Sequence, residues 1–187
     1  MPVPTLQVVR ETDKGVVIAG MKMLATGSAY ANDIYIGNVL PLAPDQKAQS
    51  ITCVIPANAK GLSLWSRRPM STGCISEFDA PLTFRYDESD CMLLCEDVLV
   101  PWEKVFVHDD ALLSRDIYIT TPAHGLGNFQ SAVRFWSKMQ LMLGLAAKIA
   151  NATGADQVPA VREKLGELSA AEATLAGMIH GQINAYE

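Results

Sequence analysis

The chain has 187 residues, of which 49% are hydrophobic and 19% are charged, proportions that support a sizeable core and argue against disorder. The formal net charge is -5 and Arg67-Arg68 is the only basic cluster, so no nucleic-acid surface is expected. The longest apolar run in a helical pattern, residues 141–147, is too short to span a bilayer, and residues 1–15 lack an apolar leader. We therefore expect a cytoplasmic protein that has no membrane partner.

Short apolar and β-branched segments, separated by turn residues, predict a β-domain over residues 1–108. Pro101 cannot donate a hydrogen bond to a sheet ladder, so it should end the last of these strands. About seven short strands favour a small antiparallel barrel or sandwich. The expected strands are residues 15–20, continuing extended to 26, then 33–39, 50–55, 62–66, 91–95 and 98–100.

The pattern changes after His108: residues 109–122 form a linker that could hold a short helix, and residues 123–187 become helical. Gly154 should end the first long helix, Asp156 should cap the second, and Pro159 suits its first turn. Two long amphipathic helices without a closing partner predict part of a larger bundle. Their apolar stripes are Val133, Trp136, Met139, Leu143 and Ala146, then Val161, Leu165, Leu168, Leu175 and Ile179.

The four cysteines, Cys53, Cys74, Cys91 and Cys95, form no Cys-x-x-Cys pair, and the chain has three histidines. This pattern predicts free thiols in strands or core and no metal site.

Three segments could hold a ligand, although none is a complete catalytic set. Met23–Ser28 offers a threonine hydroxyl and backbone amides to a flat heterocycle, or is only a strand that ends at a glycine turn. The hydroxyl-rich loop Pro69–Gly73 could line a pocket, or merely connect two elements. His124 lies where free amides at a helix start favour polar ligands, or it serves only as a cap.

Taken in order, five segments resemble the 4-hydroxyphenylacetate 3-hydroxylase family, the oxygenase components of two-component, reduced-flavin-dependent aromatic hydroxylases. The most specific is the run Glu-Asp-Val-Leu-Val-Pro-Trp-Glu-Lys-Val-Phe, which follows Cys95. The five segments are Gly15–Ala31, Arg85–Asp90, Cys95–Phe106, His124–Gly144 and Gly154–Gly166.

The resemblance implies an acyl-CoA dehydrogenase-like fold, with an N-terminal helical domain, a middle β-barrel domain and a C-terminal four-helix bundle through which subunits form a homo-oligomer. Residues 1–108 would be the middle domain and residues 123–187 the first part of the bundle, with the N-terminal domain absent. The catalytic partners of the substrate would lie in that missing domain, so the fragment alone is expected to be inactive.

The resemblance also implies the chemistry. Reduced FAD, supplied by a flavin reductase component, would react with O2 to give a C4a-hydroperoxide that hydroxylates a phenolic substrate ortho to its hydroxyl group. The site must exclude water, because a hydrated hydroperoxide collapses to hydrogen peroxide. The resemblance assigns Met23, Ala25, Thr26 and His124 to the flavin, and Ser71 and Thr72 to the substrate.

Three other functions are compared with this one. An acyl-CoA dehydrogenase-like flavoenzyme would share the wider fold, and a non-catalytic binding or assembly module would need no catalytic residues. The flavin and iron-sulphur dehydratases of the same family place a cluster cysteine seven residues after the histidine at the start of the bundle, which the resemblance matches to His124. The residue at that position is Ser131, which argues against a cluster.

Overall fold

The structure is a computed structural model that describes residues 5–86 and 89–186. Two residues of the Arg85–Asp90 segment, Asp87 and Glu88, lie outside the described residues. The chain divides into two compact units, Met1–Ile119 and Thr120–Glu187, and each is described by itself.

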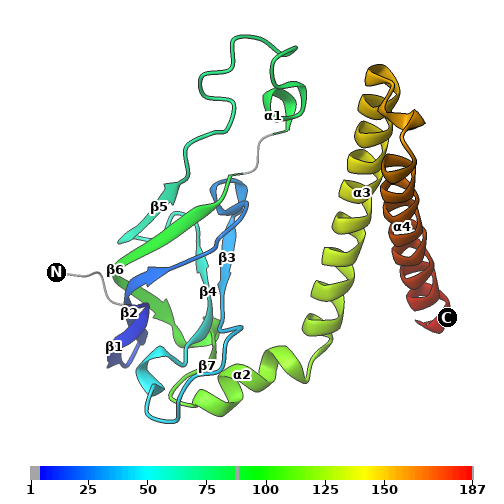
Figure 1. The fold of residues 1–187 in the computed structure, drawn as a ribbon. Coiled ribbons are helices and arrows are strands. Elements are labelled where there is room, and N and C mark those ends of the chain that lie inside the picture. The colour runs from blue at the N-terminus through cyan, green and yellow to red at the C-terminus, as the bar shows by residue number, and fades with distance from the viewer. Residues whose placement is uncertain (1–4, 87–88, 187) are drawn as a thin grey trace. The chain divides into compact units, whose positions relative to one another are not determined.

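The first unit contains two antiparallel sheets (Figure 1). The larger sheet has the order β1-β2-β6-β5, formed by β1 (Gln7–Thr12), β2 (Gly15–Lys22), β6 (Cys91–Pro101) and β5 (Leu62–Ser66). The central strands of this sheet are rich in apolar residues, which suit a pleated, buried surface. The pairs β1–β2, β2–β6 and β5–β6 are all antiparallel.

The smaller sheet has the order β3-β4-β7, formed by β3 (Asp33–Ile36), β4 (Thr52–Pro56) and β7 (Val105–Val107). In β3 the side chains alternate between exposed and buried, as expected for a strand with one face on the core. Residues of both sheets share one apolar core, so the sheets pack face to face as a sandwich. That core consists of Leu6, Val16, Ile18, Ile34, Ile36, Ile51, Cys53, Ile55, Leu93, Cys95, Val98 and Val100.

The prediction of two separate strands at 91–95 and 98–100 is wrong, because both belong to the single strand β6. Opposite β2 the register shifts between the pairs Ile18–Val98 and Gly20–Cys95, which is a β-bulge. Within the bulge Asp97 has φ 55°, in the left-handed region that Asp tolerates. The two consecutive acidic residues Glu96 and Asp97 therefore lie at a bulge within one strand, whereas the sequence predicted a break between two strands.

Other boundaries also differ from expectation. Strand β2 ends at Lys22, and β3 ends at Ile36 instead of residue 39. A short 3-10 turn, η1 (Ser28–Tyr30), follows the glycine turn at Gly27. The edge strand β1 was not predicted, because its mixed polar sequence lacks a clear apolar alternation.

Four further helical elements of the first unit lie outside the sheets. The first is α1 (Pro81–Arg85), within the long segment between β5 and β6. Short 3-10 turns, η2 (Lys47–Gln49) and η3 (Trp102–Lys104), precede β4 and β7. Helix α2 (Ala111–Ile119) occupies most of the segment expected to be a linker.

The second unit is a helical hairpin of α3 (Pro122–Thr153) and α4 (Pro159–Tyr186), joined by the 3-10 turn η4 (Ala155–Gln157). Gly154 ends α3 with φ 74°, as predicted, since glycine adopts this left-handed conformation without steric cost. The prediction that Asp156 caps the next helix is wrong. Asp156 lies inside η4, because the chain makes an extra turn to reverse direction before Pro159.

One stripe of α3 is partly covered by α4, and its members recur at alternating spacings of three and four residues. The predicted stripe is correct at four of its five positions, but Val133 is 36% exposed and lies beside it. No helix in the described part of the chain is both long and apolar enough to cross a bilayer. The covered positions of α3 are Phe129, Ala132, Trp136, Met139, Leu143, Ala146 and Ala150.

Candidate functional site

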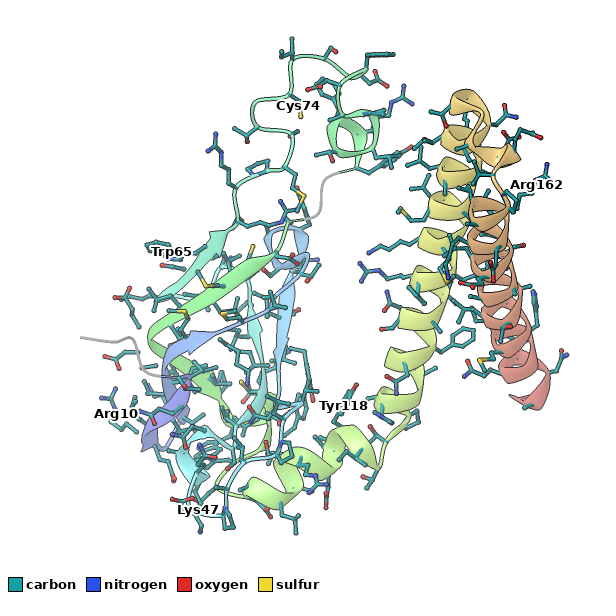
Figure 2. All side chains as sticks on the ribbon, viewed as in Figure 1. Arg10, Lys47, Trp65, Cys74, Tyr118 and Arg162 are labelled. Carbon is teal, nitrogen blue, oxygen red and sulfur yellow. The ribbon has the colours of Figure 1, made fainter. Side chains whose placement is uncertain are left out.

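The first unit contains an open cleft of about 850 Å³, within the size range of small-molecule sites. Its walls come from the end of β2 and the turn after it, from β3 and the segment that follows, and from the end of α2. Tyr118, marked in Figure 2, is the lining residue closest to the end of α2.

Met23, Ala25 and Thr26, the three residues assigned to a flavin in this unit, all line the cleft. The segment that carries them is held by backbone hydrogen bonds to the start of β6. The N–H of Ala25 donates to the carbonyl of Cys91 at 2.9 Å, and the N–H of Gly27 donates to the carbonyl of Ser89 at 3.0 Å. The wall is therefore fixed by the sheet even though β2 has ended.

Thr26 and Asp90 lie opposite each other between those two backbone hydrogen bonds. The Thr26 hydroxyl donates to Asp90 Oδ1 at 2.5 Å. The other carboxylate oxygen of Asp90 lies 3.8 Å from Nε of Arg67, whose backbone N–H donates to the Asp90 carbonyl at 2.9 Å. Three polar side chains from different segments thus form one chain of contacts at the edge of the cleft.

Lys22 is a cleft residue that the sequence analysis missed. Its Nζ donates to Asn38 Oδ1 at 2.5 Å, and Asn38 Nδ2 donates to the Ser114 hydroxyl and to the Gln49 carbonyl, both at 2.9 Å. Burial lowers the pKa of Lys22, and the nearby Cys53 thiol acts in the opposite direction. A signal was available, since Lys22 is the only charged residue between Gly15 and Ser28.

Ser71 and Thr72 do not line this cleft. They belong to the long segment between β5 and α1, on which Figure 2 marks Cys74. There the N–H of Thr72 donates to the Pro69 carbonyl at 3.2 Å, which closes a local turn. Their assignment to a substrate stays a prediction.

His124 belongs to the second unit, in the first turn of α3. Its Nε2 lies 3.0 Å from Asn128 Nδ2, one helical turn further on. The Thr121 side chain caps the same helix by accepting from the N–H of Ala123 at 3.3 Å. His124 is thus a polar residue at a helix start, and its assignment to a flavin stays a prediction.

The four cysteines are free, as predicted. Burial raises the pKa of Cys53 to about 12 and that of Cys95 to about 11, so both thiols stay protonated and act as apolar core groups. Among residues 5–86 and 89–186, no three His, Cys, Asp or Glu side chains are grouped to hold a metal ion.

Comparison with known proteins accounts for nearly the whole chain. Residues 1–107 match the family 4-hydroxyphenylacetate 3-hydroxylase N terminal, and residues 114–187 match 4-hydroxyphenylacetate 3-hydroxylase C terminal. The chain is 36% identical over 176 residues to the pyoverdin chromophore biosynthetic protein PvcC of Pseudomonas aeruginosa, covering 92% of this chain and 35% of that protein. The chain spans about a third of the length of the curated relatives it matches.

Solved structures agree with this result. One is the oxygenase component of 4-hydroxyphenylacetate 3-monooxygenase complexed with FAD and 4-hydroxyphenylacetate, with TM-score 0.86, 30% identity, and coverage of 96% of this chain and 37% of that one. An acyl-CoA dehydrogenase from Slackia heliotrinireducens, at 16% identity, has TM-score 0.62 over 97% of this chain and 44% of its own. The expected mixed fold, antiparallel sheets followed by two long helices with an acyl-CoA dehydrogenase-like arrangement, is confirmed.

Proposed function

The chain belongs to the 4-hydroxyphenylacetate 3-hydroxylase family, and from this we propose that its protein is the oxygenase component of a reduced-flavin-dependent aromatic monooxygenase. The observation that carries the proposal is the cleft at the end of β2, lined by Met23, Ala25 and Thr26. These are the residues that the family resemblance assigns to the flavin. We further propose that residues 1–108 form the middle domain, 109–122 a connection, and 123–187 the first part of a helical bundle.

The proposed cofactor is FAD, used in its reduced form. The residues present fit a flavin ring, since the cleft combines small and apolar side chains with a hydroxyl group and a half-buried lysine. Met23, Ala25 and Thr26 would contact the ring, and Lys22 would place positive charge beside it. His124 is proposed as a further flavin-binding residue. These residues would bind and orient the cofactor.

The proposed reaction is hydroxylation of a phenol at the carbon ortho to its hydroxyl group. When bound, reduced FAD supplies two electrons to O2, so that one oxygen atom enters the phenol and the other leaves as water. Phenol, O2 and FADH2 therefore give catechol, FAD and water. Ser71 and Thr72 would lie on the substrate side, and a separate flavin reductase would supply FADH2.

We also propose that the helical unit mediates a homo-oligomer. Besides the stripe against α4, α3 exposes apolar side chains that are 49% to 62% accessible, at spacings of three, four and seven residues. Such a second stripe is typical of a helix that packs against further helices. Its members are Phe135, Met142, Leu145 and Ile149.

The test uses the protein expressed from its complete reading frame, mixed anaerobically with FADH2 and a panel of phenols and then exposed to 18O2. We expect a catechol that carries one 18O atom, and no product when oxidised FAD replaces FADH2. Thr26→Val should raise the fraction of O2 that is lost as hydrogen peroxide without lowering the midpoint of urea unfolding. Formation of hydrogen peroxide alone with every phenol would overturn the proposal.

A further inference from the structure

The contact between Thr26 and Asp90 has a fixed geometry. Backbone hydrogen bonds on both sides, from Ala25 to Cys91 and from Gly27 to Ser89, hold the two residues directly opposite each other. Facing side chains at such a position are close neighbours, as they are in any antiparallel pair. The 2.5 Å hydrogen bond from Thr26 Oγ1 to Asp90 Oδ1 follows from this placement.

This hydrogen bond determines what Thr26 can offer to a ligand. A threonine hydroxyl has one proton and two lone pairs, whereas an ionised carboxylate only accepts. Because the proton is donated to Asp90, the remaining capacity of the Thr26 oxygen is that of an acceptor. Thr26 lines the cleft, so it presents an acceptor to ligand N–H or O–H groups there.

Arg67 makes a carboxylate tolerable at this position. Its Nε lies 3.8 Å from Asp90 Oδ2, and both side chains are about a quarter to a third exposed. The guanidinium offsets the negative charge that Asp90 would otherwise direct toward an anionic ligand. Asp90 therefore still accepts the hydrogen bond from Thr26, while Arg67 offsets its negative charge.

We propose that Asp90 is a positioning residue that holds the Thr26 hydroxyl as an acceptor toward the cleft and so favours the reduced over the oxidised flavin ring. The chemical reason is that two-electron reduction adds an N–H at the central ring, at a nitrogen that in the oxidised ring is itself an acceptor. A fixed acceptor can accept a hydrogen bond from the N–H of the reduced ring. In the oxidised ring the same acceptor faces a nitrogen lone pair, so no hydrogen bond forms. This inference rests on the proposed function, because it requires a flavin in the cleft.

The test measures the dissociation constants of oxidised and reduced FAD, the latter under anaerobic conditions, for the protein expressed from its complete reading frame. The readout is their ratio, which is independent of turnover. Asp90→Ala frees the Thr26 proton, so the preference for reduced FAD should fall about three- to tenfold, the usual value of one net hydrogen bond. Asp90→Asn keeps an acceptor oxygen for Thr26 and should restore most of the preference.

Two further variants separate positioning from a general structural effect. If Asp90 acts through Thr26, the double variant Thr26→Val with Asp90→Ala should have the same ratio as Thr26→Val alone. Asp79→Ala removes a carboxylate from the same long segment, away from the residues that line the cleft, and should leave the ratio unchanged.

The outcomes distinguish the inference from the proposed function. If the unsubstituted protein binds neither form of FAD, the proposed function fails and the inference fails with it. If it binds reduced FAD and hydroxylates phenols, but Asp90→Ala leaves the ratio unchanged, the inference alone is overturned. Effects of Thr26→Val and Asp90→Ala that simply add would also overturn it, because they would show that the two residues act independently.

Discussion

The two units of the chain bury apolar side chains to very different extents. In the β-unit, twelve core residues from the two sheets and the segments next to them are between 0% and 6% exposed. In the described part of the helical unit, Ala150 and Ile179 are the only buried hydrophobic residues, while much larger side chains on α3 stay exposed. The β-unit therefore closes its own core, whereas the hairpin has one closed seam and a second apolar stripe in contact with solvent.

The difference shows where each unit gets its stability. A face-to-face sandwich removes apolar surface from water on both sheets, and this burial is the main favourable term in folding. A two-helix hairpin can bury only one stripe per helix, so helices of this kind depend on further partners. The cleft is built on the unit that has the buried core, and backbone hydrogen bonds to Ser89 and Cys91 hold part of its wall.

The largest expected effect is on the free energy of unfolding, when a core side chain of the β-unit is truncated. A truncation on the exposed stripe of α3 is the comparison. Ile18→Ala, at a site that is 0% exposed, should lower the free energy of unfolding by about 2–5 kcal/mol, since it removes buried methyl groups and leaves a cavity. Ile149→Ala, at a site that is 55% exposed, should cost less than about 1 kcal/mol. Urea unfolding followed by circular dichroism would measure both, and equal costs would remove the contrast between the units.

Alkaline pH should weaken the β-unit selectively, because the core thiols Cys53 and Cys95 have raised pKa values of about 12 and 11 in the folded protein. Thiols of the unfolded chain ionise near pH 9.0, so the unfolded state loses protons first and stability falls above that pH. The loss should approach about 1.4 kcal/mol per pH unit for each thiol, until the thiols also ionise in the folded protein. Lys22 opposes this below pH 10.5, because its lowered pKa lets the folded protein release that proton before the unfolded chain does.

Urea unfolding between pH 8 and pH 10 would measure that slope. Cys95→Ala should reduce stability at pH 8, because it truncates a buried side chain, and yet flatten the dependence on pH by nearly the contribution of one thiol. An unchanged slope in this variant would mean that Cys95 does not carry the alkaline sensitivity. The helical unit contains no cysteine, so this effect is confined to the sandwich.

The sequence predicted the fold best where burial alone decides it. Strands with apolar alternation, such as β3, and the ends of α3 at Pro122 and Gly154 follow from local patterns. The prediction failed at β1 and at the bulge in β6, because pairing with a neighbouring strand there overrides a polar local sequence. No local pattern shows that two acidic residues will continue a strand.

In the candidate site, too, some residues could be predicted from the sequence and others could not. Met23, Ala25 and Thr26 were found through the family resemblance, and the structure brings all three to one cleft. Asp90 and the network around Lys22 were not found as site residues, since the partner of Asp90 lies 64 residues away and that of Lys22 lies 16 residues away. Contacts of this kind depend on the register of the strands, which a single sequence does not contain.

The seam of the helical hairpin should show a smaller effect. Trp136 Nε1 donates to Glu172 Oε1 at 2.5 Å, and the Trp136 ring packs edge-on against His180 with centroids 5.8 Å apart. Trp136→Phe keeps an aromatic ring but leaves Glu172 without this donor, at a cost of about 1–2 kcal/mol. Glu172→Gln keeps an acceptor and should cost less. Thermal unfolding followed at 222 nm would rank the variants, and equal costs would show that the hydrogen bond contributes little.

The smallest effect concerns the start of α3. Thr121→Ala removes the cap on the N–H of Ala123 and should cost about 0.5–1 kcal/mol, whereas Thr121→Ser keeps the hydroxyl and should restore stability. Because a cap acts only on the first turn, amide hydrogen exchange should speed up near Ala123 and stay unchanged in β2 and β6. Faster exchange throughout the β-unit would show that the two units unfold together, and the contrast between a self-sufficient sandwich and a dependent hairpin would then no longer hold.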